Sequence, residues 1–304
     1  MDQIAEIKGT EHWAEKGDAK LFMWRKTLSG SAPRGVALFV HGSSMASQPT
    51  FDLQVPGRPF SSAMDYFASK GFDCWCVDME GYGRSTKDRG TRATISDGGD
   101  DLEAADKVIR AISGDGPMCV YGISSGALRA ATFAERQPAR VARLALDAYV
   151  WTGKGSPTLQ ERAKKLDFFK ANDRRPIDRA FVHSIFNRDH AGTADDKVVD
   201  AFADAILALD DSMPTGTYTD MCAHLPLNDP KKLTMPTIVM RGEYDGIASM
   251  EDLLDFFGRL PHPDKQFTVM QGIAHASFQQ LNYMTVYDVL LDFWTRTPPV
   301  YTGH

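Results

Sequence analysis

Short runs of apolar residues alternate with longer amphipathic stretches along most of the chain. Continuous apolar runs predict strands buried on both faces; they cover residues 35–40, 72–78, 117–122, 141–150, 235–242 and 265–272, and an alternating run at 20–27 predicts a further strand. Helical periodicity covers residues 61–70, 100–112, 127–137, 249–260 and 276–295. Strands that alternate with helices in this way predict an α/β fold with a mostly parallel sheet covered on both faces.

One long segment, residues 151–228, breaks this rhythm because it has no clear buried-strand run. It carries three amphipathic patterns instead, at 159–170, 177–186 and 196–210, each with apolar residues at helical spacing. Prolines punctuate the segment between these patterns. We therefore expect a helical lid inserted between two strands of a core formed by residues 1–150 and 229–304. The alternative is a set of extra packing helices without a lid function.

Composition limits the partners that we expect. Apolar residues make up 43% of the chain and charged residues 24%, which is ordinary for a globular protein. The formal net charge of −6 argues against nucleic acid or an anionic membrane surface as the main partner. No apolar run approaches the roughly 18 residues that a membrane-spanning helix needs. A small-molecule substrate is the expected partner, and the oligomeric state is left open, with a homo-oligomer as one alternative.

The cysteines and the first residues indicate a cytoplasmic setting. Three of the four cysteines, Cys74, Cys76 and Cys119, lie inside predicted strands. Cys74 and Cys76 share one strand face, but no second ligand pair follows at a usual spacing, so buried thiols are favoured over a metal site. The first 13 residues show no basic-then-apolar signal pattern. Reduced, buried cysteines fit a reducing compartment.

Residues 122–126 read Gly-Ile-Ser-Ser-Gly, a G-x-S-x-G pattern that is weak alone and more specific in its context. It follows a predicted strand and opens a predicted helix, which is the strand-to-helix elbow that exposes a nucleophilic Ser124. The helix N-terminus supplies free N–H groups where an oxyanion would develop, and Ser125 is expected to lend its backbone N–H. The alternative is a serine in a tight turn without chemistry.

A serine hydroxyl needs a base and an orienting acid to act as a nucleophile at neutral pH. Among eight histidines, His275 alone follows directly after the last predicted strand, so we expect it to be the general base. Asp245 follows the preceding strand and completes the chain order Ser, Asp, His. Asp147, at the end of the strand run 141–150, is the alternative acid or a turn residue, and Glu243 is a third candidate.

His41-Gly42-Ser43-Ser44 directly follows the strand 35–40. A turn at this place offers a second backbone N–H to an oxyanion, most simply that of Ser43. His41 is of the catalytic type, but we expect it to be structural, bonding within the loop. Four residues are candidates for the substrate pocket: Ser44, Tyr82, Trp151 and Phe181. The aromatic side chains of residues 151–228 indicate an apolar or aromatic substrate group or, equally, the core of the lid.

Together these motifs resemble the α/β-hydrolase superfamily, in its lidded esterase and lipase-like branch. The resemblance covers about 220 residues and rests on five motifs in order: HGSS at 41–44, DMEGYGRS at 78–85, GISSG at 122–126, RGEYDG at 241–246 and GIAH at 272–275. It implies an eight-stranded, mostly parallel sheet, no cofactor and no metal, and an acyl-enzyme on Ser124. The segment 45–60 is long for its place, so it either shapes the acyl pocket or forms a rigid surface loop.

We therefore expect a serine esterase in which Ser124 attacks a carboxylic ester. The same residues could cleave an amide, a lactone, a thioester or a C–C bond, or transfer an acyl group, because the pocket decides among these carbonyl reactions. A hypothesis from another class is a ligand-binding receptor with a dormant triad.

Overall fold

The computed structural model describes residues 6–298 and residue 300. Within them, one sheet of eight strands has the order β1-β2-β4-β3-β5-β6-β9-β10. Its strands are β1 (Ile7–Lys16), β2 (Ala19–Leu28), β3 (Gly35–Val40), β4 (Phe72–Val77), β5 (Met118–Ile123), β6 (Val141–Asp147), β9 (Thr237–Gly242) and β10 (Lys265–Met270). Only the pairs β1–β2 and β2–β4 are antiparallel. The expected mostly parallel sheet of eight strands is confirmed.

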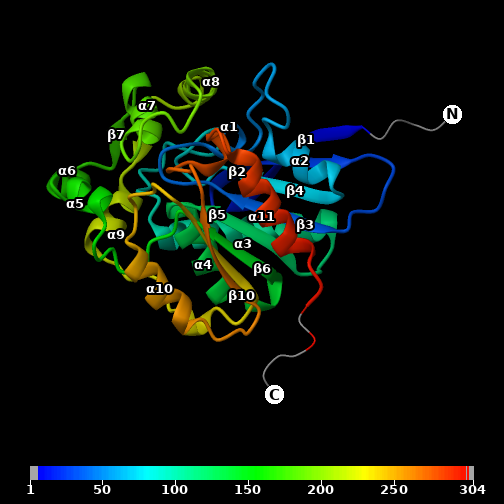
Figure 1. Ribbon diagram of the computed structural model, residues 1–304. Coiled ribbons are helices and arrows are strands. Elements are labelled where there is room, and N and C mark those ends of the chain that lie inside the picture. The colour runs from blue at the N-terminus through cyan, green and yellow to red at the C-terminus, as the bar shows by residue number, and fades with distance from the viewer. Residues whose placement is uncertain (1–5, 299, 301–304) are drawn as a thin grey trace.

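Helices cover both faces of the sheet (Figure 1). On one face, α3 (Ile95–Ser113) and α4 (Ser125–Arg136) pack against each other, and α4 lies on β5 and β6. On the other face, α2 (Ala63–Ser69) packs with α11 (Tyr283–Thr295). The central strands β4 and β5 are buried along their whole length, which is why their sequences are nearly continuous apolar runs.

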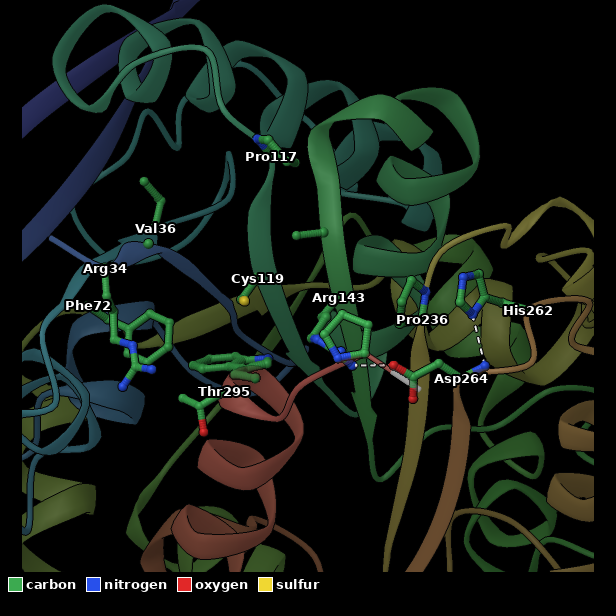
Figure 2. Close-up of a pocket in the computed structure, with 14 residues that line it drawn as sticks. Arg34, Val36, Phe72, Pro117, Cys119, Arg143, Pro236, His262, Asp264 and Thr295 are labelled. Atoms are coloured by element: carbon green, nitrogen blue, oxygen red, sulfur yellow. Dashed lines mark hydrogen bonds and ion pairs between the residues drawn. The ribbon is translucent and has the colours of Figure 1, made fainter. Parts of the chain in front are cut away.

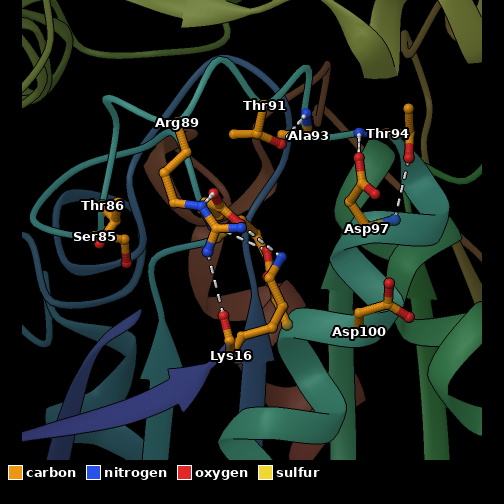
Figure 3. Close-up of polar contacts among 12 residues, drawn as sticks. Lys16, Ser85, Thr86, Arg89, Thr91, Ala93, Thr94, Asp97 and Asp100 are labelled. Carbon is orange, nitrogen blue, oxygen red and sulfur yellow. Dashed lines mark hydrogen bonds and ion pairs between the residues drawn. The ribbon is translucent and has the colours of Figure 1, made fainter. Parts of the chain in front are cut away.

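The edge strand β1 was not predicted, because its residues are mostly exposed and no apolar run marks it. Polar contacts hold it to the rest of the core (Figure 3). Lys16 forms an ion pair with Asp101 of α3 and another with Glu80 at 2.9 Å. Glu80 lies in the turn after β4, so these contacts tie the edge strand to the turn DMEGYGRS.

Helix α3 begins five residues earlier than the periodicity predicted. A capping box starts it: the Thr94 side chain accepts from the Asp97 N–H, and Asp97 accepts from the Thr94 N–H (Figure 3). Such a box satisfies two N–H groups at the helix start. The helix therefore starts at the cap, ahead of the segment in which the periodicity marked it.

Between β6 and β9 the chain forms mainly helices, which gather beyond the carboxyl ends of the parallel strands (Figure 1). They are α5 (Pro157–Ala163), α6 (Leu166–Ala171), α7 (Arg179–Asn187), α8 (Asp196–Leu207) and α9 (Gly216–Ala223). The helix expected at 159–170 is split in two, and a small antiparallel pair, β7 (Arg174–Pro176) with β8 (Ser212–Pro214), was not expected. We call residues 151–228 the lid segment; that it opens and closes stays a prediction.

The segment 45–60 contains the short helix α1 (Ser47–Phe51), whose residues are almost all buried against the sheet. Of helix α10 (Met250–Arg259), only one face is buried.

Cys74, Cys76 and Cys119 are buried as expected, and burial raises the pKa of the Cys119 thiol to about 12. None of the described helices is long and apolar enough to cross a membrane.

Candidate active site

Ser124 occupies a sharp turn between β5 and α4, as the sequence pattern predicted. Its backbone has φ 57° and ψ −126°, a conformation that costs an L-residue about 1–3 kcal/mol. Two hydrogen bonds hold the turn: the Ser124 N–H donates to the Asp147 carbonyl at 2.9 Å, and the Ala127 N–H donates to the Ser124 carbonyl at 2.9 Å. Such strain persists only where the surrounding structure imposes it.

The two glycines of the pattern allow the turn to pack tightly. A Cβ at Gly122 would overlap the backbone of Gly126 and Ala127, at the start of α4. A Cβ at Gly126 would overlap the carbonyl groups of Val40 and His41. The glycines are therefore required by close backbone approach between the elbow and the neighbouring loop after β3.

The loop after β3 lies directly beside Ser124. A Cβ built on Gly42 would be 3.3 Å from the Ser124 Cβ. Next to Gly42, the Ser43 hydroxyl accepts a hydrogen bond from the Ser125 hydroxyl at 3.0 Å. The backbone N–H groups of Ser43 and Ser125 donate to no described residue. Two free donors thus flank the elbow, where the sequence predicted an oxyanion hole.

His275 and Asp245 are joined by a hydrogen bond of 3.0 Å between Nδ1 and Oδ1. Both side chains are buried, as is Ser124. Burial alone would raise the pKa of Asp245, but the charge and hydrogen bond of His275 and the Ile247 N–H outweigh it, so the pKa lies below its usual value. The Asp245 carboxylate is therefore held ionised next to the ring. The Ser124 hydroxyl has no hydrogen-bond partner among the described residues.

Asp147, the alternative acid, has a different partner. Its Oδ2 accepts a hydrogen bond from the Tyr121 hydroxyl at 2.6 Å, and it makes none with His275. Its complete burial raises the pKa of this carboxyl to about 7. The structure thus pairs His275 with Asp245 and leaves Asp147 beneath the elbow.

His41 bonds within its own loop region. Its Nδ1 donates to the Gly42 carbonyl at 2.7 Å, and its Nε2 accepts from the Met79 N–H at 3.0 Å. Burial, followed by the charge of Arg129, lowers the pKa of His41 to about 3, so the ring is neutral. Both ring nitrogens are engaged, which fits the structural role that we expected.

Three of the other described histidines have partners elsewhere. His183 and His224 bond aspartates of the lid segment. His262 lines a cavity of about 560 Å³ at the opposite, amino-terminal edge of the parallel strands (Figure 2). There it accepts a hydrogen bond from the Asp264 N–H at 3.0 Å, and Asp264 pairs with Arg143 at 2.8 Å. This cavity is remote from Ser124 because the elbow follows the carboxyl end of β5.

A second cavity, of about 720 Å³, lies between the lid segment and the loop after β9. We call it the lid pocket. Phe181 and Asp245 line it, and its wall residue Tyr218 forms a hydrogen bond of 2.7 Å with the Ser44 hydroxyl. Of the four residues predicted to line a substrate pocket, Phe181 lines this cavity and Ser44 touches its wall.

The remaining two candidates lie elsewhere. Tyr82 is completely buried and its ring packs on His41 with centroids 4.9 Å apart. Trp151 packs on Phe256 and donates from its indole to the Asn228 carbonyl at 3.1 Å. Neither lines the lid pocket. The sequence placed them near strand ends but held no information on where their rings point.

Among the described residues, one group of side chains has ligand atoms spaced for a metal ion. Asp189 of the lid segment, Asp245 and His275 each offer one atom, all within 4.8 Å of one another. Two of these three already bond each other, so a cation here would compete with the Asp245–His275 contact. Sequence analysis missed Asp189, because nothing in its local pattern separates it from other lid carboxylates.

A family described as "Serine aminopeptidase, S33" matches residues 31–282, which spans most of the chain. This chain belongs to that α/β-hydrolase family. A comparison with curated proteins gives no match.

Solved α/β hydrolases share the fold over nearly the whole chain. A 2-hydroxy-6-oxo-6-phenylhexa-2,4-dienoate hydrolase from Rhodococcus sp. strain RHA1 is 15% identical, with a TM-score of 0.68 over 96% of this chain and 100% of that one. Carboxylesterases from Nitrososphaera gargenis (14%, TM-score 0.67, 93% and 97%) and an enol-lactonase from Burkholderia xenovorans LB400 (16%, 0.65, 94% and 100%) are similar. At these identities the likeness concerns the fold.

Proposed function

We propose that this α/β hydrolase cleaves carboxylic esters through an acyl-enzyme on Ser124. The hydrogen bond between His275 and Asp245 carries the proposal. Both residues follow parallel strands, at the same edge of the sheet where Ser124 follows β5. A histidine oriented by an ionised acid therefore lies at the same sheet edge as the strained serine.

In the proposed reaction, the Ser124 oxygen bonds to the ester carbonyl carbon and His275 Nε2 takes the hydroxyl proton. The oxyanion that forms accepts hydrogen bonds from the N–H groups of Ser43 and Ser125. The C–O bond to the alcohol then breaks, and His275 returns the proton to the leaving oxygen. Water repeats the sequence on the acyl-enzyme and releases the acid. Asp245 keeps the ring in the tautomer that presents Nε2 as a base.

The lid pocket supports a small to medium substrate with an apolar or aromatic part. Its volume of about 720 Å³ lies in the range of small-molecule sites. Aromatic rings contribute to its wall from both sides: Phe169, Phe181 and Tyr218 from the lid segment, and Tyr244 from the loop after β9.

One further candidate function has an observation in its favour, because the family description names an aminopeptidase. The same residues would acylate Ser124 from an amide, with an amine as the leaving group. The two reactions differ only in the leaving group, so matched esters and amides of one acyl group separate them.

The test is labelling with a fluorophosphonate, followed by intact-mass measurement and peptide mapping. We expect one adduct on Ser124, no adduct in Ser124→Ala, and slow labelling in His275→Ala. Ser69→Ala, an exposed serine on α2, is the matched control and should label normally. Matched esters, amides and lactones of graded acyl size then define the reaction. Absence of an adduct on the folded protein would contradict the proposal.

A further inference from the structure

The lid pocket carries a group of positive side chains without carboxylate partners. Arg162 of α5 and Arg175 of β7 line the pocket and form no ion pair in the described structure, and Lys165 beside them forms none either. Arg162 Nη1 is sealed from solvent and has no hydrogen-bond partner. Buried polar atoms are normally paired, so a guanidinium with one sealed, unpartnered nitrogen points to an absent anion.

Both arginines lie beside the same aromatic ring. The guanidinium carbons of Arg162 and Arg175 lie 5.3 and 5.2 Å from the centroid of the same Tyr218 ring. Burial, followed by the charge of Arg188, lowers the pKa of Arg162 to about 10, and Arg175 contributes in the same direction. Like charges held together in a partly buried place destabilise one another until an anion neutralises them.

The carboxylates of the pocket wall already have partners. Glu161 pairs with Lys164 at 2.6 Å, and Glu243 accepts from the Gly272 N–H at 2.8 Å. Asp189 accepts from Thr158 at 3.2 Å and from Arg188 at 3.4 Å, and Asp245 bonds His275. Of the remaining cations, Arg241 is engaged by three backbone carbonyls. No carboxylate of the described wall therefore neutralises Arg162 or Arg175.

We propose that the lid pocket binds an oxyanion group, a carboxylate or a phosphate, of an ester substrate that also carries an aromatic or apolar body. The paired N–H groups of a guanidinium can bond two oxygens of either a carboxylate or a phosphate at once. The aromatic side chains of the wall would contact the aromatic or apolar part of the substrate. The pocket adjoins the chemistry: Asp245 lines it, and Tyr218 bonds Ser44 next to the oxyanion loop. The inference deepens the proposed function and rests on it for turnover, but not for binding.

The kinetic test compares three methyl benzoates with a para methyl, carboxylate or phosphate group. We expect kcat/KM to be about tenfold or more higher for one of the charged esters than for the neutral one. Arg162→Gln and Arg175→Gln should raise KM for that charged ester about tenfold and should raise KM for the neutral ester much less. The para carboxylate and para phosphate arms identify the anion. Equal kcat/KM for all three esters, or a preference that survives both substitutions, overturns the proposal.

Two controls keep folding and electrostatics apart from binding. Arg175→Lys retains the charge without the fork, and Lys197→Gln removes one exposed lid charge outside the pocket wall and should change nothing. Calorimetry of terephthalate and phenyl phosphate with Ser124→Ala measures binding without turnover. If the protein binds these anions through Arg175 but is not labelled by fluorophosphonate, the anion site stands and the esterase proposal fails. If the protein is labelled but shows neither anion binding nor a preference for a charged ester, the esterase proposal stands and the anion site fails.

Discussion

Asp245 Oδ1 lies 3.0 Å from His275 Nδ1, although 30 residues separate the two side chains. Asp147 ends β6, the neighbour of the strand β9 that Asp245 follows, and instead accepts a hydrogen bond from Tyr121. Two buried carboxylates at neighbouring strand ends therefore have different environments. One is held ionised beside a histidine, and the pKa of the other is raised by burial.

This difference predicts effects of very different size on kcat for two matched substitutions. Asp245→Asn should lower kcat on an ester by about three to four orders of magnitude, because the ring loses the acid that sets its tautomer. Asp147→Asn should leave kcat within about threefold, because this residue does not touch His275. Steady-state kinetics on one ester measures both. A large loss of kcat in Asp147→Asn with retained stability would make Asp147 the acid instead.

The raised pKa of Asp147 also predicts a pH dependence of stability. Native Asp147 keeps its proton up to about pH 7, whereas the unfolded carboxyl releases it near its ordinary value of 3.8. The native state thus binds more protons in this window, and the contribution of Asp147 to stability decreases as pH rises through it. Urea unfolding from pH 4.5 to 7.5, at intervals of about half a unit, should show a shallower decline in Asp147→Asn than in the wild type. Asp167→Asn, on the exposed side of α6, should follow the wild type.

The strained backbone of Ser124 predicts a conflict between stability and function. Ser124→Gly should be more stable than Ser124→Ala by about 1 kcal/mol, because glycine adopts φ 57° without a Cβ clash. Both variants should fail to form the fluorophosphonate adduct. In the exposed middle of α3, Lys107→Gly should instead be less stable than Lys107→Ala by about 1 kcal/mol. Thermal unfolding measures both pairs, and equal melting temperatures for the two Ser124 variants would argue against strain.

His41 is expected to act on stability and not on the chemical step. His41→Gln should lower the free energy of unfolding by about 2 kcal/mol, since two buried hydrogen bonds of the ring are lost or distorted. Labelling of Ser124 should remain measurable in the folded fraction. His183→Gln, at a half-exposed position of α7, should change stability little. A His41→Gln protein of normal stability that no longer labels would assign His41 a chemical role.

Much of the fold follows from local patterns. Continuous apolar runs located the buried strands, because burial on both faces demands such runs. The alternation with helices predicted that these strands run mostly parallel. The exposed strand β1 and the split helix α5–α6 escaped prediction, since exposed edges and short helices leave little periodicity. The elbow at Ser124 was predictable because a glycine-flanked serine between a strand and a helix is itself a local signal.

The sequence by itself determined which segments form the buried, mostly parallel strands, the place of the elbow and the short set of candidate acids and bases at strand ends. Only the tertiary structure shows that His275 bonds Asp245 and not Asp147, because both carboxylates lie at the ends of buried strands and the partner depends on where the loop after β10 brings His275. The grouping of Arg162 and Arg175 around Tyr218 was equally invisible in the sequence. Their charges lie on separate elements, and only packing brings side chains that are distant in sequence within reach of one ligand.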